Sequence, residues 1–114
     1  MPYEKDDFCY NLENVIQKIC HSKSVTYPFV VFSMVSVVKE YSEYEIKLSF
    51  AKDTIFELQA DSFMRNCMLE ISKKFNIYNW HDVSTSIETR YILCFSKKEA
   101  DLINVLLKME QANV

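Results

Sequence analysis

The pattern of hydrophobic and polar positions is clearest near the C-terminus, where strand-like alternation changes to helical spacing. Between residues 87 and 95, alternate residues share one side of an extended chain, which predicts a strand that packs this side on the core. Ser96 and Glu99 follow directly and have the spacing of a capping box. We therefore predict a helix that starts at Lys97. The side of the strand expected to face the core carries Ile87, Thr89, Tyr91, Leu93 and Phe95.

The predicted C-terminal helix has a wide apolar arc. Its polar residues form one narrow stripe, made by Asp101, Asn104, Lys108 and Gln111. The rest of the circumference is largely apolar, which is more than one face of a sheet needs to cover. Either the helix is pinned between the sheet and a second helix, or part of the arc binds a partner. The arc consists of Leu102, Ile103, Val105, Leu106, Leu107 and Met109.

Two earlier segments also have helical spacing. The first follows a frayed lead of residues 1–6, starts at a cap provided by Asp6 or Asp7, and ends near residue 21 or 22. Its apolar face carries Phe8, Leu12, Val15, Ile16 and Ile19. The second starts at a cap provided by Asp61 or Ser62. Its apolar stripe carries Phe63, Met64, Cys67, Met68, Ile71 and Phe75.

Strands are predicted between these two helices. The segment 27–39 is rich in β-branched and aromatic residues, 40–43 is a polar turn, and 44–50 alternates apolar with polar residues. A third strand at 54–59 completes an antiparallel meander, and 77–82 is a short extended or irregular piece. The predicted order is α-β-β-β-α-(β)-β-α. Residues 1–114 thus form a single α+β domain, with helices packed on an antiparallel sheet.

The chain contains no glycine. Phosphate-binding loops, the dinucleotide-binding fingerprint and the nucleophile elbow of hydrolases each need backbone conformations that only glycine supplies readily, so these motifs are excluded. Tight hairpin turns must then use Asn or Asp, or give way to longer loops.

The charge and the cysteines give little sign of chemistry. The net charge is −3, which gives no electrostatic footprint for duplex nucleic acid or an anionic membrane. No apolar run is long enough to span a bilayer, and the N-terminus lacks the pattern of a signal peptide. Cysteines at positions 9, 20, 67 and 94 lie in apolar patterns without metal-ligand spacing, so we expect reduced, buried thiols. We expect an intracellular, non-enzymatic protein with no metal and no cofactor.

Binding of nucleic acid is the alternative. Exposed aromatic residues of a sheet can stack on bases, and pairs of lysines can line a groove for the backbone. Aromatic residues at strand spacing are more often part of a core, and lysines at helix ends more often face water. The residues considered for this role are Tyr78, Trp80, Arg90, Tyr91, Lys73, Lys74, Lys97 and Lys98.

The segment Arg90–Phe95, followed by Ser96–Ala100 and an apolar helix, resembles the end of pleckstrin-homology-like domains. In those domains a last strand leads into a C-terminal helix that plugs an open barrel. Within this group the chain looks most like the N-terminal domain of meiotic accessory proteins that help the recombination machinery make programmed DNA double-strand breaks, a similarity that includes Ile55–Gln59. The resemblance implies a PH-like open barrel with a C-terminal helix as a variant of the fold. It also implies a non-catalytic scaffold domain in the nucleus.

Two features depart from that group. The helix at 8–21 is additional, and Phe63–Phe75 has helical spacing where a barrel would have strands. A phosphoinositide pocket cannot be carried over from the resemblance, because the loop that would need basic residues carries Glu40, Glu43 and Glu45.

These observations favour a protein-interaction or scaffold domain that self-associates or binds a partner helix through its C-terminal helix and the neighbouring first helix. An exposed aliphatic strip beside a polar one is typical of helix-docking interfaces. The residues predicted to contact the partner are Leu12, Val15, Ile19, Leu102, Val105, Leu106, Leu107 and Met109.

Overall fold

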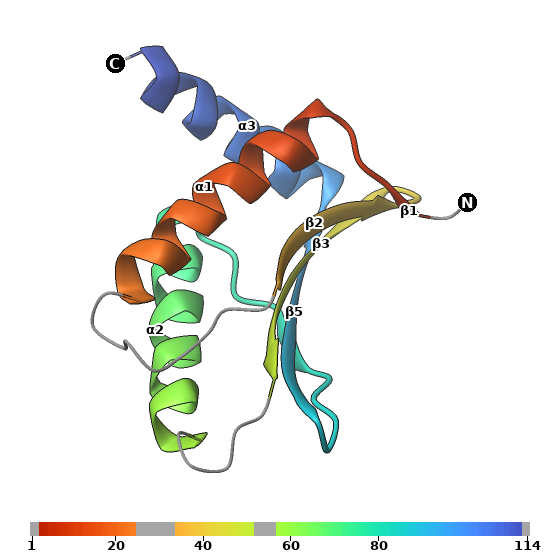
Figure 1. The fold of residues 1–114 in the computed structure, drawn as a ribbon. Coiled ribbons are helices and arrows are strands. Elements are labelled where there is room, and N and C mark those ends of the chain that lie inside the picture. Colours follow the sequence, from red (N-terminus) through yellow and green to blue (C-terminus); the bar gives the residue numbers. More distant parts are fainter. Residues whose placement is uncertain (1–2, 25–33, 52–56, 113–114) are drawn as a thin grey trace.

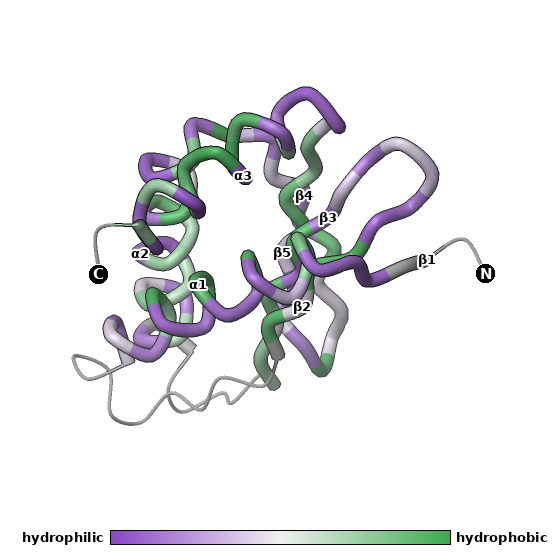
Figure 2. The backbone as a smooth tube through the Cα atoms, turned by 90° about the horizontal axis from the view of Figure 1, so that it is seen from above, coloured by the Kyte–Doolittle hydropathy of each residue, from purple (hydrophilic) through white to green (hydrophobic). Residues whose placement is uncertain are grey.

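The described part of the protein is a two-layer structure in which three helices cover one face of an antiparallel sheet (Figure 1). A computed structural model describes residues 3–24, 34–51 and 57–112. Seen from above, the helices lie on one side and the strands on the other (Figure 2). In chain order the elements are β1 (Tyr3–Glu4), α1 (Asp7–Ser24), β2 (Met34–Glu40), β3 (Glu43–Ala51), α2 (Glu57–Phe75), β4 (Trp80–Asp82), β5 (Glu88–Ser96) and α3 (Lys97–Ala112).

The described strands pair in the order β1-β2-β3-β5-β4, and every neighbouring pair is antiparallel. The short strands β1 and β4 stand at opposite edges and do not pair with each other. The predicted α+β class, an antiparallel sheet with helices packed on it, is therefore confirmed. The described strands form an open sheet and not the PH-like barrel of the resemblance.

The core lies between the sheet and the helices, and alternation along the strands fills it. Ile46 of β3 stands between Val37 of β2 and Leu93 of β5, and all three side chains are buried. Near α1, the ring of Tyr44 stacks on Phe95 at 5.4 Å, and Phe8 meets Tyr44 edge-on. The predicted inward face of the last strand is confirmed from Thr89 to Phe95. Ile87 precedes β5 and is exposed.

The prediction of a third strand in the meander is wrong. Residues 57–59 are the first turn of α2, so the helix begins before the predicted caps Asp61 and Ser62. The sequence Glu57-Leu58-Gln59-Ala60 consists of strong helix formers, and extending an existing helix adds a hydrogen bond for each residue that is ordered. Residues 54–56 of the predicted strand lie outside the described residues.

Two other boundaries differ from the prediction. The strand predicted at 27–39 is observed from Met34 to Glu40, and residues 27–33 lie outside the described part of the chain. Within the predicted frayed lead, Tyr3 and Glu4 pair with Glu40 and Lys39 of β2. This lead therefore contributes a short edge strand.

The β2–β3 turn shows how the chain makes a hairpin without glycine. Tyr41 and Ser42 connect the paired residues Glu40 and Glu43, and Tyr41 has a φ of 57°. This left-handed conformation is uncommon for a bulky residue. The expectation that a tight hairpin would need Asn or Asp is wrong here. At the end of α2 the usual rule holds, because Asn76 has a φ of 56° and terminates the helix.

Local side-chain caps fix the starts of α1 and α3. Asp6 Oδ1 accepts a hydrogen bond from the Cys9 amide at 2.9 Å, which confirms the predicted start of α1. Glu99 N–H donates to Ser96 Oγ at 3.2 Å, and Ser96 N–H donates to Glu99 Oε1 at 3.1 Å. The predicted capping box, and with it the start of α3 at Lys97, is confirmed.

A side chain of α1 also reaches the backbone of β2. The Glu13 carboxylate accepts a hydrogen bond from the Val37 amide at 3.2 Å and forms an ion pair with Lys5. Only Lys39 and Glu40 of β2 pair with β1, so this contact lies on the part of β2 beyond β1. The carboxylate thus occupies a donor that a neighbouring strand would otherwise use.

Candidate protein-binding surface

Of the two apolar faces of α3, one packs on the other described elements and one does not. The inner face carries Ala100, Ile103 and Leu107, all buried, which rest against β5, β3 and α1. The outer face follows i, i+3, i+4 and i+7 spacing and is exposed. We call it the outer seam. It consists of Leu102, Val105, Leu106 and Met109, with exposed fractions of 64%, 55%, 40% and 57%.

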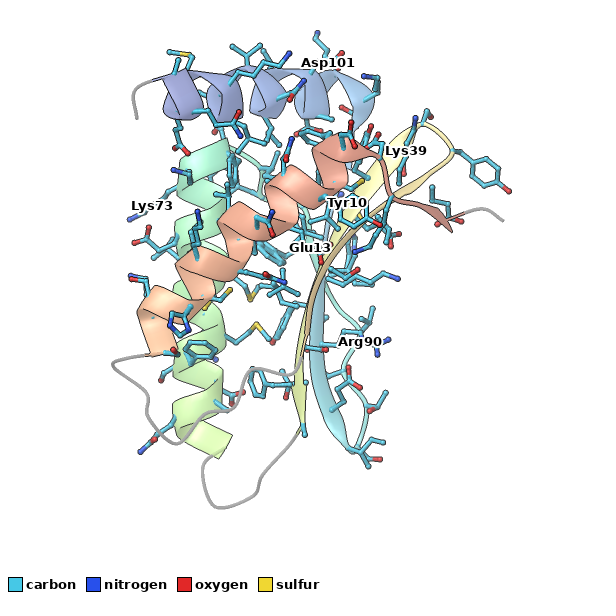
Figure 3. All side chains as sticks on the ribbon, turned by 45° about the horizontal axis from the view of Figure 1, so that its top comes forward. Tyr10, Glu13, Lys39, Lys73, Arg90 and Asp101 are labelled. Atoms are coloured by element: carbon cyan, nitrogen blue, oxygen red, sulfur yellow. The ribbon has the colours of Figure 1, made fainter. Side chains whose placement is uncertain are left out.

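The position of α3 in the fold explains this exposure. The helix follows β5 directly and crosses one end of the two layers (Figure 1). Side chains along α3 project away from α1 and α2 (Figure 3). Four aliphatic side chains exposed to this extent present on the order of 400 Å², a size common for functional patches on monomers. The outer seam is therefore an apolar surface that the described part of the chain leaves in water.

The structure separates the residues predicted to contact a partner. Leu102, Val105, Leu106 and Met109 form the outer seam. Leu12 and Leu107 are core residues with exposed fractions of 0% and 4%, which corrects their assignment to a partner surface. The physical reason for Leu107 is its angle on the helix, which turns it toward the core while its neighbour Leu106 faces outward.

The α1 residues Val15 and Ile19 have an intermediate position. Both are half-buried against the core and line a groove of about 490 Å³ between α1 and α2. Glu110 of α3 also lines this groove. Since Glu110 follows Leu106 by one turn of α3, the groove borders the outer seam. The other residues lining the groove are Lys18, Ser22, Lys23, Glu70 and Lys74.

The carboxylates of α3 are engaged within the chain. Glu99 belongs to the capping box, Asp101 pairs with Lys97 at 2.6 Å, and Glu110 pairs with Lys74 of α2. Two α3 lysines differ from them. Lys98 and Lys108 are exposed and have no ion-pair partner among the described residues. Lys98 and Lys108 are therefore two positive charges on α3 that no ion pair of the described residues compensates, although the chain as a whole is acidic.

The position of Lys98 beside the outer seam was not predicted from the sequence. Lys98 was grouped with Lys97 as a solvated pair or as part of a nucleic-acid groove. A signal was present, because Lys98, Leu102, Val105 and Met109 follow i, i+4, i+7 and i+11 spacing. Lys98 thus lies in line with the outer seam at its N-terminal end. The pairing of Glu110 with Lys74 had no sequence signal, since the two residues are 36 positions apart and lie on different helices.

Most of the thiols are shielded from solvent. All four cysteines are free, and Cys9, Cys20 and Cys67 are buried. Burial raises the pKa of Cys9 to about 11, and burial beside Glu45 raises the pKa of Cys94. The adjoining Cys67 side chain and burial raise the pKa of Cys20, whereas the hydrogen bond with Cys20 lowers the pKa of Cys67. A thiol with a raised pKa is protonated at neutral pH and is a poor nucleophile.

The aromatic residues considered for base stacking do not share one exposed surface. Trp80 and Tyr91 are on the helix-covered side of the sheet, where they pack against the core, and Trp80 Nε1 donates to Ser72 Oγ at 2.7 Å. Tyr78 is exposed and precedes β4. Two of the four lysines named with them are paired, Lys74 with Glu110 and Lys97 with Asp101.

No three His, Cys, Asp or Glu residues gather to hold a metal ion in the described ranges. Within the same ranges, no helix is both long and apolar enough to cross a membrane. Comparison of the chain with protein-family models, with curated proteins and with solved structures found no match.

Proposed function

We propose that this chain is a non-enzymatic protein-interaction domain that binds another protein through the outer seam of α3. The observation that carries the proposal is the exposure of Leu102, Val105, Leu106 and Met109 at helical spacing on a helix whose opposite face is buried. A helix that serves only to cover a core is expected to be polar on its outer side. Four aligned aliphatic side chains in water therefore favour a docked partner.

The spacing of the outer seam indicates how the partner binds. Side chains at i, i+3, i+4 and i+7 form the stripe that an amphipathic helix presents to a groove or to another helix. The seam contributes on the order of 400 Å², about half of the roughly 800 Å² that each side of a standard interface buries. The interface must then extend past the seam, and the bordering groove lined by Val15 and Ile19 supplies further apolar surface.

Charge substitution tests this proposal. Val105→Glu places a carboxylate in the outer seam, whereas Gln111→Glu places one on the polar stripe of the same helix. Sedimentation and quantitative affinity purification from the source cells would compare both variants with wild type. We expect Val105→Glu to lose the associated protein and Gln111→Glu to retain it, with circular dichroism spectra and melting temperatures near wild type. Equal association of wild type and Val105→Glu would refute the proposal.

The resemblance to meiotic accessory proteins gives one specific form of this proposal, in which the domain is nuclear and its partner belongs to a chromosome-associated recombination complex. The residues that support this form are Arg90–Ala100, at the end of β5 and the start of α3. The purification described above would show recombination proteins lost on Val105→Glu. Partners from another process, lost in the same way, would contradict the meiotic form and leave the interaction proposal intact.

A further inference from the structure

We infer that the partner of the outer seam is an amphipathic helix of another protein, with acidic residues beside its apolar stripe. This inference rests on the proposed function and specifies the chemistry of the partner. It comes from the charges around the outer seam. The α3 carboxylates are hydrogen-bonded or ion-paired within the molecule, whereas two lysines of α3 have no ion-pair partner among the described residues.

Lys98 and Lys108 define this positive charge. Lys98 stands in line with the seam, one turn before Leu102, and Lys108 stands one turn after Val105 on the polar side of the seam. Both side chains are exposed, and neither has an ion-pair partner in the described part of the chain. The nearby charge of Asp101 is neutralised by Lys97 at 2.6 Å. A helix docked on the seam therefore meets two ammonium groups along one side.

A second copy of this chain does not supply the matching carboxylates from its own α3. If two α3 helices paired in parallel and in register, Lys98 would face Lys98 of the other copy. If they paired antiparallel about the centre of the seam, Lys98 would face the last turn, where Met109 and Ala112 continue the line of the seam. The carboxylate of that turn, Glu110, is already paired with Lys74, so neither arrangement gives Lys98 an unpaired carboxylate. Like charges facing each other disfavour association, and opposite charges on the rim mainly select the partner.

The exposed area of the outer seam also favours a helix of another protein over a second copy of this chain. Two copies joined by their outer seams alone would each bury about half of what a standard interface buries on each side. A helix from another protein is not limited to the length of α3. It can extend from the seam past Glu110 to the groove, where Lys18 provides another exposed ammonium group.

Two synthetic peptides test the inference with the full chain. Both carry the same leucine stripe and are long enough for about four helical turns. One has Glu and the other Lys at the positions beside the stripe. Fluorescence anisotropy would measure their binding at low and high salt. We expect roughly tenfold tighter binding of the Glu peptide at low salt, the ratio for two exposed ion pairs, and a smaller ratio at high salt.

Two double variants locate the charge effect. Lys98→Glu with Lys108→Glu reverses the charge beside the seam and should reverse the preference to the Lys peptide. Arg65→Glu with Lys73→Glu makes the same change in net charge on α2, outside the seam and the groove lining, and should leave the preference for the Glu peptide. An unchanged preference in the first variant would contradict the inference.

The possible outcomes separate this inference from the proposed function. Equal binding of both peptides, abolished by Val105→Glu, would overturn the acidic partner and support the seam as a binding surface. Self-association in sedimentation, also abolished by Val105→Glu, would identify a second copy as the occupant and overturn the inference in the same way. If neither peptide bound and Val105→Glu changed no association, both proposals would fail.

Discussion

α1 and α3 both begin at a side-chain cap, and both pack on the same face of the sheet, yet they differ in how much apolar surface they leave in water. α1 lies between α2 and β2 and buries its apolar face, with Phe8, Val15 and Ile19 packed at the edges of the core. α3 crosses one end of the layers and has neighbours on one side. Its other side keeps the outer seam exposed. The number of apolar positions on a helix therefore does not tell which of them a neighbour will cover.

The largest expected effect compares two positions of α3. Leu107→Glu puts a carboxylate among buried side chains, which should reduce the free energy of unfolding by several kcal/mol, a large part of the roughly 5–15 kcal/mol of a typical domain. Val105→Glu, two residues earlier, should change it by less than about 0.5 kcal/mol, as at other exposed positions. Urea denaturation measures both. Equal losses would show that the outer seam is covered by the protein itself.

The next largest effect compares the two helices with the same substitution. Leu12→Ala in α1 removes a fully buried side chain and should cost about 2–5 kcal/mol. Leu102→Ala in α3 removes one that is 64% exposed and should be close to neutral for stability. Denaturant midpoints of the two variants provide the measurement. A small loss for Leu12→Ala would contradict the packing of α1 described above.

A smaller effect concerns the cap of α1 and its dependence on pH. Burial alone would raise the pKa of Asp6, but hydrogen bonds from the Cys9 amide and the Tyr44 hydroxyl outweigh it and hold the pKa below the ordinary value of 3.8. The carboxylate therefore stabilises the fold fully above that pH, and the stabilisation is lost as pH falls through the folded-state pKa. Asp6→Ala should cost about 1–2 kcal/mol at neutral pH.

The pH series distinguishes this account from a simple loss of packing. The difference in unfolding free energy between wild type and Asp6→Ala should be constant at neutral pH and shrink in acid, below about pH 4. Asp6→Asn, which keeps an acceptor oxygen without the charge, should show a smaller loss. A difference that did not vary with pH would exclude the carboxylate as its source.

The smallest effect concerns the cap of α3. Ser96→Ala removes the acceptor for the Glu99 amide and should cost about 1 kcal/mol. Glu99→Ala removes the hydrogen bonds that the Ser96 amide and hydroxyl donate to its carboxylate, and should cost less. Because α3 holds the outer seam, both variants should also weaken partner binding slightly, in proportion to the fraying seen by circular dichroism. Full binding by a visibly frayed α3 would argue against the seam as the interface.

Local chemistry made some features predictable from the sequence. The start of α3 followed from Ser96 and Glu99, since a capping box needs only residues in one turn. The facing of β5 followed from alternation, because Leu93 and Phe95 must point to the same side. The strands β2 and β3 followed from a β-branched and aromatic segment before a polar turn and from alternation after it.

Other features depend on distant parts of the chain. Leu106 and Leu107 are neighbours with the same hydropathy, and only the placement of α3 on β5 decides which of them is buried. Residues 57–59 suit a helix or a strand on pattern alone, and the adjoining helix decided between them. The residues of the outer seam were all among those predicted to contact a partner. Which charges of α3 are paired could not be predicted, because pairs such as Glu110 with Lys74 form only in the fold.

The hydrogen bond from the Val37 amide to Glu13 has a consequence for the exchange of backbone protons with solvent. This amide lies in a strand, yet its acceptor is a side chain of α1. It can exchange with deuterium whenever α1 lifts from the sheet, even if β2 and β3 stay paired. The exchange rate of this one proton therefore reports how often α1 undocks, separately from the opening of the sheet itself.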